Sequence, residues 1–311
     1  MLNFFHSIQL AVTRIFRENK ILLRWEQRHP QSYHMVRKRL AFNEPYGFLF
    51  TLGSLVSALF FLSFLALMLG LLYGAPYVAA DTRVMNLIAA IRTPELANFF
   101  LFFTDLYDPA IVVSFAFVVV IFLGAINRIR EIWFFLWGGV VAEIICLLVS
   151  ITVARARPDL GFALITQGGY SFPSTHAAMS LFFYGMVGYG FLEIFTRWWQ
   201  RSLTALIVFA VTFLVGISRM ILGVHWGSDV VAGWTLGFAL LIFWVTLFEE
   251  WERFHPVREP MRMSTKNAVL IGLALIIIEG AFIFWYYQTN PLKKEGGVGT
   301  YAETEITAPL N

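Results

Sequence analysis

Seven long stretches of this chain carry almost no charge, and this pattern constrains the fold more than any other feature. They are Gly47–Tyr73, Pro109–Leu123, Ile132–Val153, Ala177–Phe195, Leu203–Leu222, Val230–Phe248 and Asn267–Tyr287. A helix that crosses a bilayer needs about 20 mostly apolar residues. Charged residues make up only 14% of the chain, against about 25% in an ordinary soluble domain. The sequence therefore predicts an all-α, polytopic membrane helix bundle.

The apolar runs divide the chain into four parts. Residues 1–46 form a basic, amphipathic N-terminal segment, for which interfacial helices on the cytoplasmic side and a solvated basic tail are both open interpretations. Residues 47–248 form a six-span core, residues 249–290 a cytoplasmic loop and a seventh span, and residues 291–311 a polar tail. Between positions 81 and 108 charges at Arg92 and Glu95 interrupt the apolar pattern, and we expect an amphipathic helix at one membrane face.

The distribution of basic residues sets the expected orientation. Positively charged residues collect in cytoplasmic loops. With the N-terminus inside, sixteen of the 23 lysines and arginines fall in cytoplasmic segments. The N-terminus is therefore expected inside and the C-terminus outside.

Three short polar runs lie at the span ends that this topology places on the outer face. They are Arg155-Ala156-Arg157-Pro158, then Pro173-Ser174-Thr175-His176, then Ser218-Arg219 followed by His225 and Asp229. Ionisable groups near a membrane interior are costly and usually functional. Each run alone has a simpler explanation, as an interfacial anchor, a helix N-cap or a packing pair. Their occurrence together at one predicted face indicates a site.

The residue types suit phosphoryl transfer. Asp229 follows His225 by four positions, so the two share one face if a helix begins near His225. A carboxylate that accepts one imidazole N–H leaves the other ring nitrogen free as a nucleophile. Arg157 and Arg219 carry planar guanidinium groups that bind phosphate oxygens.

The run at the start of the fourth span completes this set. Ser174 and the first backbone N–H groups of that helix form an anion site. His176 is placed to donate a proton to a departing oxygen. The pattern therefore predicts a site that uses neither metal nor cofactor.

These residues resemble the type 2 phosphatidic acid phosphatase (lipid phosphate phosphatase) superfamily, whose pattern is Lys-x6-Arg-Pro, Pro-Ser-Gly-His and Ser-Arg-x5-His-x3-Asp. The third motif matches in full, and the resemblance covers roughly residues 50–248. It implies a phosphohistidine intermediate on His225, supported by Asp229, with His176 as the acid. It also implies that Arg157, Ser174 and Arg219 hold the phosphoryl group.

The chain departs from the family pattern at two positions. Ser150 stands where the family has lysine, and Arg155 is a possible substitute for that charge at the phosphate. Thr175 replaces the glycine before the histidine and keeps its backbone N–H as a phosphate donor. We expect these changes to alter substrate fit or rate.

The resemblance implies an enzyme of the bacterial inner membrane that hydrolyses a lipid phosphate or diphosphate, such as undecaprenyl diphosphate or a phospholipid phosphate, at the periplasmic face. Two alternatives stay open, namely a lipid phosphotransferase with the same site and a catalytically weak lipid-binding relative. The expected partners are the lipid substrate and membrane lipids. Nucleic acid is not expected, because the net charge of +3 is small and scattered. The sequence does not indicate the oligomeric state.

Two carboxylates, Glu143 and Glu279, lie inside apolar runs. A carboxylate within the membrane is a candidate for function. We favour the simpler interpretation, in which each forms a hydrogen-bonded contact between helices.

Overall fold

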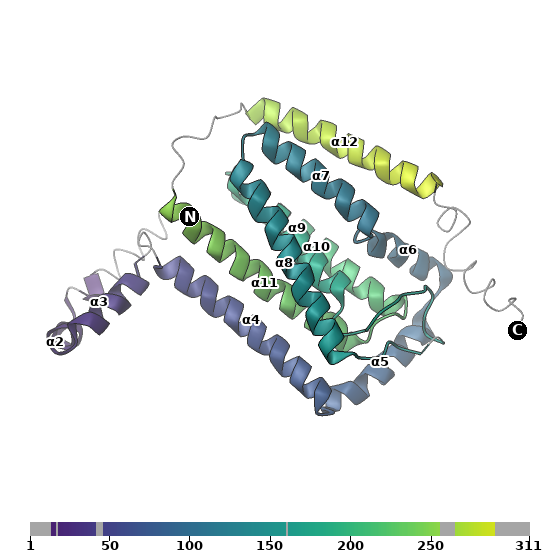
Figure 1. Ribbon diagram of the computed structural model, residues 1–311, viewed down its shortest axis with the longest axis horizontal. Coiled ribbons are helices and arrows are strands. Elements are labelled where there is room, and N and C mark those ends of the chain that lie inside the picture. The colour runs from purple at the N-terminus through teal and green to yellow at the C-terminus, as the bar shows by residue number, and fades with distance from the viewer. Residues whose placement is uncertain (1–13, 17, 42–45, 160, 256–264, 290–311) are drawn as a thin grey trace, which may run out of the picture. The chain divides into compact units, whose positions relative to one another are not determined.

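The structure is a computed structural model that describes residues 14–16, 18–41, 46–159, 161–255 and 265–289 (Figure 1). Within these residues the regular elements are helices: α2 (Lys20–Arg28), α3 (Pro30–Arg39), α4 (Phe48–Leu72), α5 (Pro76–Ile91), α6 (Pro94–Asp105), α7 (Pro109–Ala125), α8 (Ile129–Val153), α9 (Thr175–Ile194), α10 (Trp198–Ile221), α11 (Gly227–Phe254) and α12 (Thr265–Thr289). The predicted polar tail, 291–311, lies outside the described residues.

Each predicted apolar run corresponds to one helix, and only run ends at Gly47, Tyr73, Phe195 and Leu222 fall just outside the helix bounds. The helices α4, α8, α9, α10 and α11 are long and apolar enough to cross a membrane. The helix α7 is shorter, with 17 residues, and α12 includes residues whose side chains are not described. The predicted all-α membrane bundle is confirmed.

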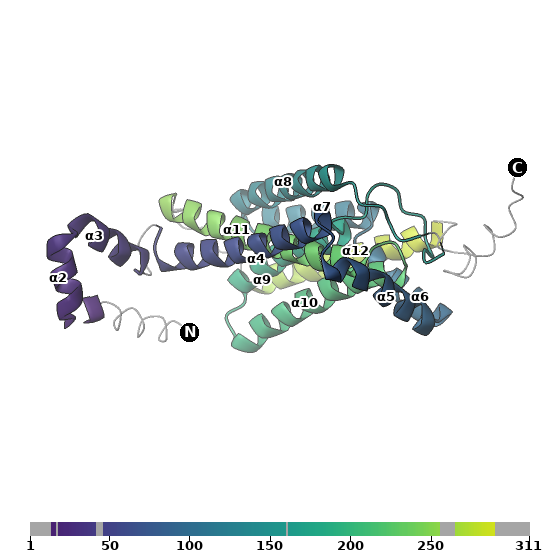
Figure 2. The same ribbon diagram turned by 90° about the horizontal axis from the view of Figure 1, so that it is seen from below.

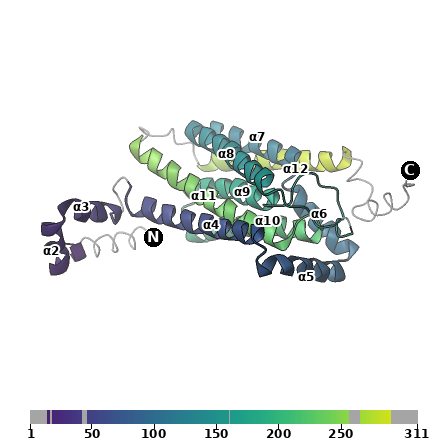
Figure 3. The same ribbon diagram turned by 60° about the horizontal axis from the view of Figure 1, so that its bottom comes forward.

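The segment between α4 and α7 differs from the prediction of a single interfacial helix. It folds as two helices, α5 and α6, which meet at an angle of 118° (Figure 3). The break falls at Pro94, which has no N–H for a continuing helix and disfavours helical geometry at Thr93 before it. Thr93 then caps α6 by accepting a hydrogen bond from the backbone of Leu96 at 3.2 Å. This bent pair is either a broken span or a re-entrant segment, and the prediction of one helix was wrong.

The chain divides into two compact units. One comprises Met1–Leu59 with Ile242–Arg258, and the other comprises Phe60–Leu241 with Glu259–Asn311. The three polar runs identified in the sequence all lie in the second unit.

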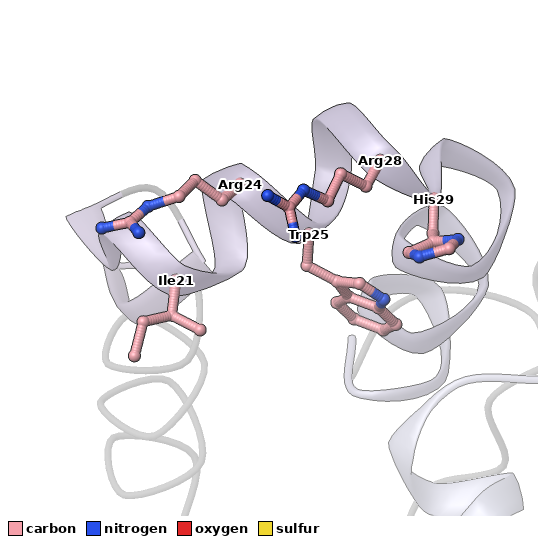
Figure 4. A pocket seen from close by; sticks show the side chains of 5 residues that line it. All are labelled: Ile21, Arg24, Trp25, Arg28 and His29. Carbon is pink, nitrogen blue, oxygen red and sulfur yellow. The ribbon is translucent and has the colours of Figure 1, made fainter.

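In the first unit, α2 and α3 pack around Tyr33. Its hydroxyl donates to the carbonyl of Phe16 at 3.0 Å, and the ring of Trp25 lies 5.9 Å from its own. Beside this core, a shallow hollow is lined by Ile21, Arg24, Trp25, Arg28 and His29 (Figure 4). The arginines lie along one edge of the hollow, with Ile21 and Trp25 along the other. The basic segment is thus helical where it is described, and its interfacial position stays a prediction.

In the second unit, close helix packing brings the polar runs together. The helix α9 lies between α8 and α10 (Figure 2). On α11, a Cβ added at Gly233 would lie 2.6 Å from the carbonyl oxygen of Ser174, and one at Gly237 would lie 2.6 Å from that of Ala178. Small residues allow helix backbones to approach closely. The two glycines therefore let the start of α11 lie directly against the start of α9.

Both carboxylates within the apolar runs form contacts between chain segments. The hydroxyl of Ser114 on α7 donates to Glu279 on α12 at 2.8 Å, and these two helices lie side by side (Figure 1). The hydroxyl of Tyr107 donates to Glu143 on α8 at 3.4 Å. Glu279 thus forms the expected contact between two helices, whereas Glu143 contacts a residue of the connection between α6 and α7.

Candidate active site

The three polar runs meet where α8 and α10 end and where α9 and α11 begin. Arg157 lies in the connection after α8, and its Nη1 donates to the carbonyl oxygen of Val224 at 2.8 Å. The backbone N–H of Ser174, at the start of α9, donates to the carbonyl of Asp229 at 3.0 Å. The tertiary structure thus joins segments that are far apart in the sequence.

His225 is buried, and its hydrogen bonds fix the position of its proton. Arg157 Nη1 lies 3.0 Å from Nε2 of the ring. Because arginine only donates hydrogen bonds, Nε2 must accept and the neutral ring carries its proton on Nδ1. That nitrogen lies 2.7 Å from the carbonyl oxygen of Ser171, which accepts from it. The lone pair of His225 is therefore on Nε2, facing a guanidinium group.

The surroundings keep His225 neutral at ordinary pH. Burial lowers the pKa of the imidazole from 6.5 to about 4. Asp229 raises the pKa of His225, whereas the positive charges of Arg219 and Arg157 lower it further. A neutral imidazole is the form that can act as a nucleophile.

Asp229 lies near His225 but does not contact the ring directly. Its Oδ2 is 3.8 Å from Nδ1 and accepts hydrogen bonds from the hydroxyl of Ser171 and from the backbone N–H of Trp226 at 3.0 Å. The helix α11 begins only at Gly227, so His225 precedes it and helical spacing does not align the two side chains. The direct contact expected from the spacing is replaced by a contact through Ser171.

Arg157 is held by the connection on which it lies. Its Nη2 donates to the carbonyl of Gly168 at 2.9 Å, and its Nε donates to that of Gly169 at 3.1 Å. Partial burial lowers the pKa of this guanidinium, and the charge of Asp229 raises it. The carbonyl contacts fix the guanidinium plane in front of His225 Nε2.

Arg219 is almost completely buried, with 1% of its surface exposed. Its Nη1 donates to Thr104 Oγ1 on α6, and its Nη2 donates to Gln167 Oε1 at 2.7 Å. Among the described residues, its Nε is a buried nitrogen without a hydrogen-bond partner. Since buried N–H groups are nearly always paired, this donor is available for an anion.

The start of α9 contributes Ser174, Thr175 and His176. Ser174 is fully buried and caps the helix by accepting from the backbone N–H of Ala177 at 3.4 Å. Thr175 is the first residue of α9. The ring of His176 packs edge-on against Tyr107, with 5.2 Å between centroids, and lies close enough to Arg219, His225 and Arg157 to interact electrostatically.

Arg155 has a different place from the one expected. Its Nη2 donates to Asp81 at 2.7 Å, and its Nη1 contacts Asp229. With both terminal nitrogens on carboxylates, we leave Arg155 out of the phosphate-binding set. Ser150, at the family's lysine position, lies in the last turn of α8, where its carbonyl accepts from the backbone N–H of Ala154.

Four residues around the site were not identified from the sequence. Asp81 gives one signal, since it is a carboxylate in a largely apolar segment. Ser171, Thr104 and Gln167 are ordinary polar residues with no distinctive spacing. Among the described residues, no group of three or more His, Cys, Asp or Glu is arranged to hold a metal ion.

Part of the chain matches a known protein family. Residues 131–253, which hold all three polar runs, match the model of the PAP2 superfamily. The resemblance seen in the sequence motifs is confirmed.

A sequence match and a structural match both come from Bacillus subtilis. The chain is 35% identical to phosphatidylglycerophosphatase B of strain 168 over 101 residues, which are 32% of this chain and 48% of that protein. The match thus spans about half the length of this relative. The fold is similar to the crystal structure of a transmembrane PAP2 type phosphatidylglycerolphosphate phosphatase, with a TM-score of 0.54, 24% identity, and coverage of 66% of this chain and 98% of that one.

Proposed function

We propose that this PAP2 protein is a membrane-embedded lipid phosphate phosphatase that forms a phosphohistidine on His225. The observation that carries the proposal is the convergence of one neutral imidazole with two guanidinium groups. Arg157 faces the nucleophilic Nε2 at 3.0 Å, and buried Arg219 has an unpaired N–H. A tetrahedral phosphate needs such donors for its charged oxygens.

In the first half of the reaction, Nε2 of His225 attacks phosphorus and the bond from phosphorus to the lipid oxygen breaks. Arg157 moves its hydrogen bond from Nε2 to a phosphate oxygen, and Arg219 Nε donates to another. The phosphate brings negative charge, which favours the protonated form of His176. His176 gives its proton to the departing oxygen, so the lipid alcohol leaves neutral.

In the second half, water replaces the lipid alcohol. Neutral His176 takes a proton from the water as its oxygen attacks phosphorus. The bond between phosphorus and Nε2 breaks, its electrons return to the imidazole, and inorganic phosphate leaves. The carbonyl of Ser171 holds the Nδ1 proton throughout, and the nearby charge of Asp229 stabilises the positive ring that forms in the first half and is lost in the second.

For the substrate we propose a phospholipid phosphate monoester first, and undecaprenyl diphosphate second. The helical bundle is suited to a substrate with lipid chains, and the curated relative is named for phosphatidylglycerophosphate. The bias of basic residues supports an active site on the outer face of a bacterial inner membrane. The acceptor in the second half is proposed to be water, and an alcohol acceptor would make the protein a phosphotransferase.

The test is release of inorganic phosphate by purified protein from a panel of phosphatidylglycerophosphate, phosphatidate and undecaprenyl diphosphate. Wild type should release phosphate from at least one lipid. His225→Ala should lose activity by on the order of 10⁴-fold or more, because no covalent intermediate can form. The matched control is His255→Ala, since His255 lies beyond the end of α11, is exposed, and stacks on Trp251.

Three outcomes would contradict the proposal. They are a wild type that binds these lipids without releasing phosphate, a His225→Ala variant that retains turnover, and transfer of the phosphoryl group to a lipid alcohol with no free phosphate. The unfolding temperature of each variant shows whether the fold is intact.

A further inference from the structure

Asp81 lies on α5, outside the three polar runs, and only 4% of its surface is exposed. Its Oδ2 accepts a hydrogen bond from Arg155 Nη2 at 2.7 Å, and its Oδ1 accepts from the backbone N–H of Ser228 at 2.9 Å. The hydroxyl of Ser228 also donates to Oδ2. Asp81 therefore contacts both Arg155 and the residue that precedes Asp229.

Arg155 joins two buried carboxylates. Its Nη2 is bound to Asp81, while its Nη1 contacts Asp229 and lies 2.7 Å from Ser228 Oγ. The exposed fractions of the Arg155, Asp81 and Asp229 side chains are 11%, 5% and 0%. The ring of Trp226 covers the guanidinium at 5.4 Å. This ion-pair chain is thus largely buried, and its members are held by the hydrogen bonds of Ser228 and by the ring of Trp226.

The chain of contacts continues to the candidate nucleophile. Asp229 accepts from the hydroxyl of Ser171, and the carbonyl of Ser171 accepts from His225 Nδ1 at 2.7 Å. We propose that Asp81 is a positioning residue for the reaction on His225, acting through Arg155 on the Asp229 carboxylate. This inference rests on the proposed phosphatase function.

The charges explain why the second carboxylate matters. One guanidinium is shared between two carboxylates, so Arg155 neutralises the Asp229 charge only in part. The remaining negative charge acts on the imidazole when it becomes positive during phosphoryl transfer. With Asp81 replaced by asparagine, Arg155 would pair with Asp229 alone. Less of the negative charge of Asp229 would then be available to stabilise the His225 ring.

The same arrangement predicts which kinetic constant changes. Asp81 contacts neither Arg157 nor Arg219, which are proposed to bind the phosphate. Removal of its charge should therefore affect the chemical step and leave substrate binding almost unchanged. An interaction that matters mainly in the transition state changes kcat rather than KM.

The experiment is a double-mutant cycle on the full-length protein, with the lipid that wild type turns over best. Asp81→Asn should lower kcat by about 10- to 100-fold, as loss of an orienting partner commonly does, with KM within about twofold of wild type. If Asp81 acts through Arg155, Asp81→Asn/Arg155→Gln should be no less active than Arg155→Gln alone. The matched control is Asp159→Asn, because Asp159 is an exposed carboxylate in the same connection as Arg155. The kinetics of this variant should equal those of wild type.

A kcat of Asp81→Asn equal to that of wild type would overturn the inference, and so would losses that multiply in the double variant. A purely structural role would lower the unfolding temperature and multiply in this way. Should Asp81→Asn not fold, Ser228→Ala removes the hydroxyl that both Asp81 and Arg155 contact. That variant should give a smaller fall in kcat at constant KM, and wild-type kinetics in it would overturn the inference.

The two proposals fail in different ways. Absence of phosphate release by wild type, or full activity of His225→Ala, contradicts the phosphatase function itself. Normal results for those two proteins with unchanged kcat in Asp81→Asn contradict only the role of Asp81.

Discussion

Arg157 Nη1 lies 3.0 Å from Nε2 of His225 and donates a hydrogen bond to it. This contact places the imidazole lone pair opposite a positive charge, in the tautomer that a nucleophilic histidine needs. A phosphate that enters between them gains Arg157 as a donor and frees Nε2 to attack. The residue that masks the nucleophile is therefore also the one that receives the substrate's charge.

The buried state of His225 predicts the pH range of activity. Its pKa is lowered to about 4, mainly by burial, so the ring loses its nucleophilic form only below that pH. We expect the His225 contribution to the acid limb of kcat/KM near pH 4 rather than near 6.5. The measurement is a pH profile of phosphate release. A His225-dependent acid limb near pH 6.5 would contradict the assigned environment.

The same shift predicts a pH dependence of stability. Between pH 6.5 and about 4 the unfolded chain protonates this histidine while the folded protein does not. The free energy of unfolding should therefore decrease as the pH falls through this window, and stay higher above pH 6.5. His225→Gln removes this contribution, so its unfolding temperature should fall less steeply from pH 6.5 to 4. Equal slopes in the two proteins would contradict the prediction.

The unpaired donor of Arg219 predicts a loss of phosphate affinity on substitution. Lysine keeps the charge but cannot reproduce three directed N–H groups. Arg219→Lys should lower kcat/KM by about 10²- to 10³-fold, the usual effect of removing a donor to a charged transition state. It should also weaken inhibition by orthovanadate.

The matched control for this prediction is Arg83→Gln, on the exposed side of α5. Kinetics and vanadate inhibition should be as in wild type. Unchanged vanadate inhibition in Arg219→Lys would show that this side chain does not bind the phosphoryl group.

The close approach of α9 and α11 predicts an effect from a single added methyl group. In Gly233→Ala the new Cβ would lie 2.6 Å from the carbonyl oxygen of Ser174 and 3.0 Å from the Cβ of Ala177. The helices must separate, at a cost of about 1–3 kcal/mol, the usual range for overpacking. We expect a lower unfolding temperature and a lower kcat, because Ser174 and His176 move with α9.

Gly190→Ala is the control, since a Cβ at Gly190, on the facing helix α9, meets no atom within 4 Å. Alanine at this helical position should stabilise the protein by about 0.5–1 kcal/mol. A Gly233→Ala protein as stable as Gly190→Ala would show that the two backbones are not in close contact.

The proposed chemistry predicts resistance to chelators. Guanidinium groups and helix N–H donors neutralise the phosphate in the mechanism, and no step requires a divalent cation. Activity measured with and without EDTA should agree within about twofold. Loss of activity with EDTA that Mg²⁺ restores would contradict this mechanism.

The helical bundle could be predicted from sequence because lipid imposes a simple requirement. A span must be long, apolar and helical, and five of the seven apolar runs form helices that meet this requirement, namely α4, α8, α9, α10 and α11. The break between α5 and α6 was missed, although Pro94 marks it. Apolar patches on both sides suggested one continuous interfacial helix, and the inward contact of Arg92 with the carbonyls of Phe162 and Ile221 became visible only in the fold.

The site shows the same division between local pattern and tertiary contact. The motif spacing by itself determined which residues belong together, including His225, His176, Arg157 and Arg219. The tertiary structure alone decided the partners, placing Ser171 between Asp229 and His225, and Arg155 on Asp81 instead of at the phosphate. Spacing along a helix fixes only neighbours within a few residues, whereas the partner of a buried charge depends on which donors and acceptors the packed helices bring within about 3 Å.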